Sequence, residues 1–145
     1  MRSFDPSGVK RIRTPRHLAP KLEAMPPYQE LDAFKVCHEL TLAIHQPLEV
    51  LKERDPELAG QLWQAALTAS SRIARGAALQ NRRMFAFCLN RSLSALCEIG
   101  YYLSLADGLN LLEPETCRKV EELRGRANFY VTKLLFSLIE PPKSD

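Results

Sequence analysis

Residues 58–112 contain two consecutive helical patterns, and this pair restricts the fold more than any other stretch of the chain. In the first pattern, steps of three or four residues join Leu58, Leu62, Ala66, Ala69 and Ile73. In the second, the same steps join Phe85, Leu89, Ser92, Leu96, Ile99, Leu103 and Ala106. Residues at this spacing share one face of an α-helix. The patterns predict two helices packed back to back, joined by a polar break at 79–81.

The second of these helices carries more apolar residues than one stripe needs. Those outside its main stripe are Met84, Phe87, Cys88, Ala95 and Tyr102. A helix that is apolar over much of its circumference is buried on more than one side. A single four-helix core would leave part of this surface exposed, and large exposed apolar patches are unusual on monomers. We therefore expect an obligate oligomer.

Two further helical patterns flank the central pair. The first covers 28–52, with a buried stripe at Phe34, Cys37, Leu40, Thr41, Ile44, Leu48 and Leu51. Pro47 falls inside it and would cost about 3 kcal/mol within a continuous helix, so a kink or short break is expected near Gln46. The last helix opens at Glu113-Pro114, stops at Pro141-Pro142, and has its stripe at Val120, Leu123, Ala127, Tyr130, Val131, Leu134 and Leu138.

Local signals place several helix ends. Asp55 followed by Pro56 predicts an N-cap and a proline at the first helical position. Asn81 is a second expected N-cap, and Gly108 is expected in the left-handed conformation just past a helix end. With no strand-like alternation, the sequence predicts an all-α, antiparallel up-down-up-down four-helix bundle over 28–140. A flexible, basic N-terminal arm (1–27) and a short C-terminal tail (141–145) complete the expected organisation.

Charge is distributed unevenly along the chain. The net charge is +3, but residues 1–27 carry +4, from six Lys or Arg and two acidic residues, and the rest carries −1. No acidic residue occurs between Glu57 and Glu98. That stretch nevertheless contains Arg72, Arg75, Arg82, Arg83 and Arg91. Arg82 and Arg83 open a helix and oppose its macrodipole, an arrangement that is easier to understand if an anion binds there.

Several classes of function find no support in the sequence. His38 and His45 share a helix face but lack a third metal ligand, and no Glu-x-x-His occurs, so we expect neither a metal nor another cofactor. No glycine-rich phosphate loop or credible nucleophile–base pair indicates an enzyme. The four cysteines form no CxxC motif and are expected to be buried free thiols of a cytoplasmic protein. No apolar run is long enough to span a membrane, and the N-terminus lacks a secretory signal.

The order of residues resembles a known family: the four-helix-bundle proteins first noticed as open reading frames in intervening sequences of 23S ribosomal RNA genes. Its start is similar to YQELDAFKVCHEL (28–40), and a later segment to YLSLADGLNLL (102–112). Its typical motif, S-x-x-x-N-I-A-E-G with a following E-F-x-x-F-L and G-S-L-x-E-L, resembles residues 68–99. Arg72, Arg75 and Met84 stand where the family pattern has Asn, Glu and Glu.

The resemblance covers about residues 28–139 and implies partners as well as a fold. It implies a homopentameric ring. The accessory variability determinant proteins of diversity-generating retroelements are distant relatives, and through them the resemblance implies binding to nucleic acid and to a reverse transcriptase.

The residues and the resemblance together suggest a non-enzymatic, nucleic-acid-binding accessory or scaffold protein. Guanidinium groups match phosphate oxygens in a bidentate geometry, so the expected RNA or DNA contacts are the arginines of the central pair and the basic residues of the arm. These residues are Arg72, Arg75, Arg82, Arg83, Arg91, Lys10, Arg11, Arg13 and Arg16. The alternative is a protein–protein adaptor whose basic face meets an acidic partner. Aromatic residues such as Phe85, Phe87 and Tyr101 could stack on bases, but helical spacing favours the core or a subunit interface.

Overall fold

A computed structural model describes residues 27–140, and all regular secondary structure in this part of the chain is helical. A short 3₁₀ turn, η1 (Tyr28–Glu30), precedes four long helices. These are α2 (Asp32–Arg54), α3 (Pro56–Ala78), α4 (Arg82–Gly108) and α5 (Pro114–Ile139). Residues 27–140 contain no β-strand, so the all-α prediction is confirmed.

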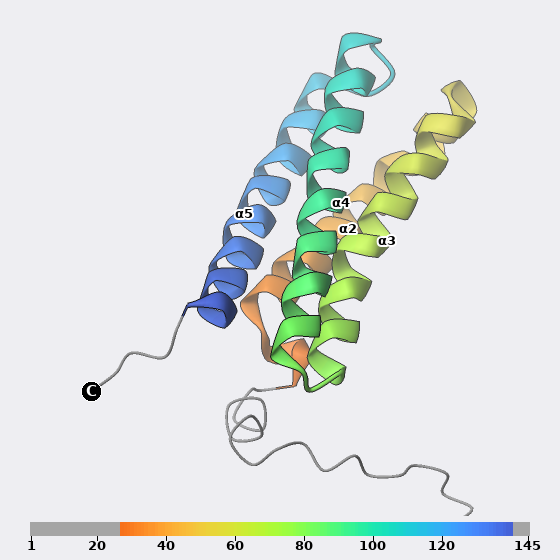
Figure 1. The fold of residues 1–145 in the computed structure, drawn as a ribbon. Helices are drawn as coiled ribbons and strands as arrows, with labels where there is room; N and C mark the ends of the chain where they lie inside the picture. The colour runs from red at the N-terminus through yellow and green to blue at the C-terminus, as the bar shows by residue number, and fades with distance from the viewer. Residues whose placement is uncertain (1–26, 141–145) are drawn as a thin grey trace, which may run out of the picture.

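The four helices lie side by side in one bundle (Figure 1). Each packs mainly against two others: α3 lies against α2 and α4, and α5 lies against the same two helices. The start of α2, the α3–α4 link and the end of α5 gather at one end of the bundle, and the α2–α3 and α4–α5 links lie at the other (Figure 1). At that second end, Arg54 Nη1 donates a hydrogen bond to the Asn110 carbonyl at 3.0 Å.

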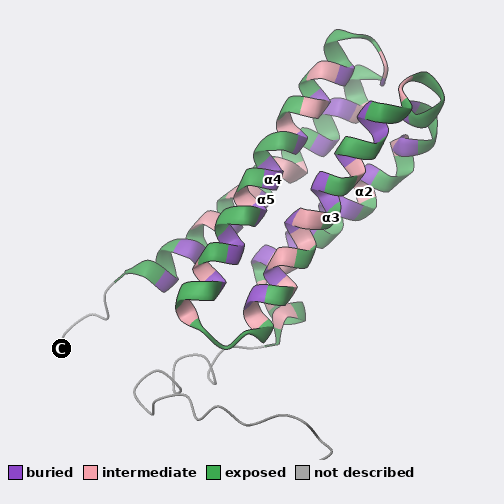
Figure 2. Ribbon diagram, turned by 45° about the vertical axis from the view of Figure 1, so that its right-hand side comes forward, coloured by how far each residue is buried: buried purple, intermediate pink, exposed green. Residues whose placement is uncertain are grey.

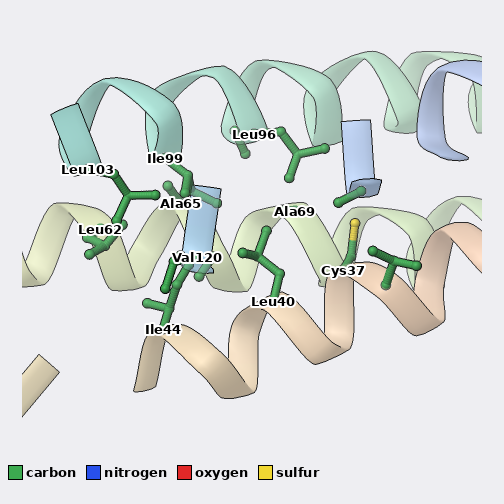
Figure 3. Close-up of a cluster of buried hydrophobic side chains, with 14 of the residues drawn as sticks. Cys37, Leu40, Ile44, Leu62, Ala65, Ala69, Leu96, Ile99, Leu103 and Val120 are labelled. Carbon is green, nitrogen blue, oxygen red and sulfur yellow. The ribbon is translucent and has the colours of Figure 1, made fainter. Parts of the chain in front are cut away.

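Apolar side chains from all four helices meet along the axis of the bundle (Figure 3). Leu40 and Ile44 of α2 point toward α3, which contributes Leu62 and Ala69 to the cluster. Ile99 of α4 and Val120 of α5 belong to the same cluster. Buried residues lie on the inner faces and exposed residues on the outer ones (Figure 2). The predicted stripes of α3 and α4 are buried at every position, Ser92 included. Burying each large apolar side chain stabilises the fold by about 1.5–3 kcal/mol.

Small and hydroxyl-bearing residues let α3 pack closely against both of its neighbours. Ala65, Ala66 and Ala69 are all buried on this helix. The Thr41 hydroxyl of α2 lies 3.2 Å from the Ala66 carbonyl and 2.8 Å from the Ser70 hydroxyl. On the other side, the Ser92 hydroxyl of α4 donates to the Ala69 carbonyl at 2.7 Å. These bonds satisfy polar groups that burial would otherwise penalise by about 1–3 kcal/mol each.

Two predicted N-caps are confirmed. The Asp55 carboxylate accepts a hydrogen bond from the Leu58 N–H at 3.0 Å, and α3 begins at Pro56. The Asn81 side chain accepts a hydrogen bond from the Met84 N–H at 2.9 Å, and α4 begins at Arg82. Each side chain satisfies one of the N–H groups that the first helical turn leaves without an intrahelical partner.

The predicted break in the helix near Gln46 is wrong. α2 continues through Pro47 to Arg54, although this proline cannot donate to the Ala43 carbonyl. Ile44, Leu48 and Leu51 are almost completely buried around it, and their packing offsets the lost hydrogen bond and the steric clash. At its start the helix is shorter than expected, because η1 takes up residues 28–30.

The prediction for Gly108 is also wrong. α4 includes Gly108, and the left-handed residue is Asn110, with φ of 56°. The Leu111 N–H bonds to the Ala106 carbonyl at 2.8 Å, and the Asn110 N–H bonds to the Asp107 carbonyl at 3.0 Å. This pair of bonds is a Schellman motif, in which asparagine replaces the usual glycine because its side chain tolerates the left-handed region.

Part of the apolar surface of α4 that was expected to need an oligomer is already covered within one chain. Cys88 and Ala95 are buried within this single bundle, because α4 packs against both α3 and α5. Met84 and Phe87 are not covered: they are 46% and 54% exposed. Among the aromatic residues, Phe85 is fully buried, whereas Phe87, Tyr101 and Phe129 are more than half exposed.

The cysteines also differ from the expectation at one position. Cys37, Cys88 and Cys117 are buried free thiols, but Cys97 is exposed. Burial raises the pKa of the Cys37 thiol to about 12, so that this group stays protonated and unreactive at neutral pH. Among the described helices, none combines the length and the apolar character needed to cross a membrane.

Candidate nucleic-acid interface

The last two turns of α3 and the first turns of α4 bring four predicted site arginines to one side of the bundle. α3 meets α2 through Ala66 and Ser70 and meets α4 through Ala69. Successive residues of an α-helix are rotated by 100° about the helix axis. Around α3, Arg72 and Arg75 therefore lie past Ala69, on the side away from α2. They therefore lie on the outer surface that α3 shares with α4.

Contacts with α3 and α5 likewise fix which face each α4 residue occupies. Cys88 and Ser92 face α3, and Gly100 lies beneath the Arg124 side chain of α5. Around the axis of α4, Phe87 and Arg91 lie past Cys88, on the side away from α5. Arg83 lies one helical turn before Phe87. We call the outer surface formed by Arg72, Arg75, Arg83 and Arg91 the arginine face.

The arginine face is accessible and unneutralised. Arg75, Arg83 and Arg91 are exposed and Arg72 is half-buried. Among residues 27–140, the ion pairs join Lys52 to Glu49, Arg118 to Glu115 and Arg124 to Glu121, and none involves the arginine face. Glu57 lies in the first turn of α3, far from these arginines, and Glu98 lies two turns after Arg91 on α4. Positive charge that is not paired with carboxylates attracts polyanions.

Arg82 has a different environment from the other predicted arginines. Its guanidinium donates hydrogen bonds to the carbonyls of Leu138, Ser137 and Glu140, the last two at 3.2 Å and 3.0 Å. These carbonyls end α5, where the helix macrodipole is negative. The end of α5 thus supplies a negative partner for the charge that Arg82 places at the start of α4. Lys10, Arg11, Arg13 and Arg16 lie outside the described residues.

The histidines of α2 take part in aromatic packing. The His38 ring stacks on Phe34 with 5.6 Å between centroids, and His45 meets the edge of Trp63 at 5.3 Å. In the part of the chain that the structure describes, no three His, Cys, Asp or Glu side chains gather in a way that could hold a metal ion.

Sequence reasoning did not find a groove between α2 and α5. It has a volume of about 400 Å³, and its apolar walls include Ala43, Pro47, Val50, Val120 and Leu123. Its charged residues are Glu113 and Lys119, one of each sign. The groove therefore has no charge preference that would indicate a class of ligand.

Comparison with known proteins agrees with this fold. A family model described as "23S rRNA-intervening sequence protein" matches residues 29–128. A solved structure from Bacteroides thetaiotaomicron, a protein of unknown function from the S23 ribosomal protein family, has a similar fold with a TM-score of 0.64. The two are 21% identical, and the match covers 75% of this chain and 99% of that one. A search of curated proteins gave no match. The family match spans more than half of the sequence, and the chain belongs to the 23S rRNA-intervening sequence protein family.

Proposed function

We propose that this protein is a non-enzymatic, nucleic-acid-binding accessory or scaffold protein that acts as a homo-oligomer. The observation that carries the proposal is the arginine face, four guanidinium groups on α3 and α4 that make no ion pair within residues 27–140. Guanidinium forks bind phosphate oxygens in a bidentate geometry, and such contacts position a nucleic acid without reading its bases. We therefore expect sequence-tolerant binding of RNA or DNA.

A charge-matched pair of variants tests this function. Replacing Arg72, Arg75, Arg83 and Arg91 with glutamine should lower affinity for a single-stranded or structured RNA or DNA by at least tenfold. The salt dependence should also flatten, because each lost phosphate contact reduces the number of counterions released on binding. Arg82 is left unchanged because it bonds to the end of α5. Fluorescence anisotropy over a range of salt concentrations measures both quantities.

The control removes the same charge elsewhere on the bundle. Lys35 of α2 and Lys119, Arg126 and Lys133 of α5 are exposed and lie outside the arginine face. Changing these four to glutamine should reduce affinity much less. Equal losses in the two variants would mean that net charge, rather than this surface, governs binding. An unchanged affinity in the first variant would exclude the arginine face as the site, leaving the arm as the candidate.

The proposal includes self-association of the bundle, whose helices alternate up-down-up-down with antiparallel neighbours. On α5, Phe129 and Phe136 are seven residues apart, hence on one face, and are 61% and 53% exposed. An exposed apolar face of this kind is typical of a subunit contact. In a homopentameric ring, as the family resemblance implies, five arginine faces at fixed spacing would add avidity for one polyanion.

Light scattering tests the self-association. At micromolar protein concentration we expect a mass several times the 16.4 kDa of one chain, and a pentamer is the expected oligomer. A mass of one chain would contradict this part of the proposal. Replacing Phe129 and Phe136 with serine should shift the oligomer toward smaller species without loss of helicity, because neither side chain is part of the core.

The second candidate is a protein–protein adaptor, and the exposed Met84 and Phe87 beside the arginines favour it. Arginine, methionine and aromatic residues are all enriched at protein interfaces. An acidic protein, or a reverse transcriptase as the family resemblance implies, would be the partner. Direct binding separates the two functions: an adaptor should bind its acidic partner through the arginine face and show no measurable affinity for RNA or DNA.

A further inference from the structure

Phe87 holds an exposed aromatic ring at the centre of a basic stripe. Arg83, Phe87 and Arg91 follow each other at steps of four along α4, so consecutive members are separated by one helical turn, about 6 Å of rise. The ring is 54% exposed, whereas Phe85, two residues earlier, is completely buried. The core therefore neither needs nor covers Phe87.

The charge next to the ring is held close to it. The Arg91 guanidinium carbon lies 5.9 Å from the centroid of the Phe87 ring, within the range of a cation–π contact. Met84, one turn before Phe87 toward the start of α4, is also exposed and adds a polarisable side chain to this surface. A ring flanked by cations presents a stacking surface and phosphate-binding groups at the same place.

We propose that Phe87 is a stacking platform for an unpaired base, so that the arginine face selects single-stranded over double-stranded nucleic acid. This inference rests on the proposed nucleic-acid binding and specifies its ligand. A base in a duplex is covered on both faces by its neighbours and cannot stack on the ring. An unpaired base can, and proteins that bind single strands combine a positive surface with such aromatic platforms.

The experiment uses the full chain and three probes of about twelve nucleotides, a length within the site sizes of single-strand-binding proteins. They are a single-stranded RNA, an abasic strand of the same backbone charge, and a duplex. The parent protein should bind the intact strand roughly tenfold more tightly than the abasic strand. Phe87→Leu should remove most of this difference, and Phe87→Tyr should retain it. Neither variant should change the salt dependence, because neither removes a charge.

The outcomes distinguish this inference from the function on which it rests. Equal binding of intact and abasic strands by the parent, or tighter binding of the duplex than of the intact strand, would overturn the stacking proposal and leave phosphate binding intact. Failure to bind any of the three probes would overturn the proposed function itself. A smaller oligomer for Phe87→Leu in light scattering, with the preference for intact over abasic strands unchanged, would make Phe87 a subunit contact and would also overturn the inference.

Discussion

Phe85→Ala should lower the free energy of unfolding by about 3–5 kcal/mol, the largest loss that we expect from any single substitution considered. The Phe85 ring is completely buried beneath Gly76, where the end of α3 crosses the start of α4. Removing the ring deletes its apolar contacts and leaves a cavity that two packed helices cannot close. Urea denaturation followed by circular dichroism measures the change.

Phe87→Ala is the matched control, because the two phenylalanines belong to the same turn of α4. Phe87 is more than half exposed, so the change in unfolding free energy should stay within about 0.5 kcal/mol. Similar losses at both positions would mean that Phe87 is covered in solution, as it would be in an oligomer interface. The pair therefore also reports on how accessible the arginine face is.

Gly76→Ala should destabilise the protein by about 1–3 kcal/mol, although alanine is the better helix former. A Cβ at position 76 would lie 2.8 Å from the Cys88 Cβ and 2.9 Å from the Phe85 Cδ1. The first of these atoms is bonded to the backbone of α4, so the clash is relieved only if the two helices move apart. Thermal and urea denaturation should both report the loss.

The contrast is Gly125→Ala in the middle of α5. A Cβ there would meet nothing within 4 Å, so only the higher intrinsic helix propensity of alanine acts. The free energy of unfolding should therefore rise by roughly 0.5–1 kcal/mol. If both alanines stabilised the protein, the close approach of α3 and α4 at Gly76 would be incorrect. Combining Gly76→Ala with Phe85→Ala should cost less than the sum, because one of the two clashing groups has been removed.

The sequence predicted the helices well because their signals are local. Caps such as Asp55 and Asn81 act within three residues, and apolar periodicity defines a buried face without knowledge of the partner helix. The buried stripes of α3 and α4 were correct for the same reason. The prediction failed where two local signals compete: at the end of α4, Gly108 and Asn110 can both adopt the left-handed conformation, and the chain uses Asn110.

Tertiary context decided the other differences. Pro47 disfavours helix by itself, and only the burial of its neighbours keeps α2 continuous. Cys97 and Cys88 both lie within the helical pattern of the sequence, yet Cys97 is exposed on an outer face of α4. For the candidate site, the sequence supplied the arginines but could not separate Arg82 from Arg83. The carbonyls that bind Arg82 belong to the last turn of α5, more than fifty residues away, and no periodicity encodes that contact.

The contact between Arg82 and the end of α5 has a consequence for the protein's local opening. A side chain in the first turn of α4 holds the final carbonyls of α5, so fraying of either terminus releases the other. Helix ends normally exchange their amide hydrogens fastest and independently of one another. Here the first turn of α4 and the last turn of α5 should instead exchange as one cooperative unit. Residues more than fifty positions apart in sequence, at the open end of the α4–α5 hairpin, would then share a single opening free energy.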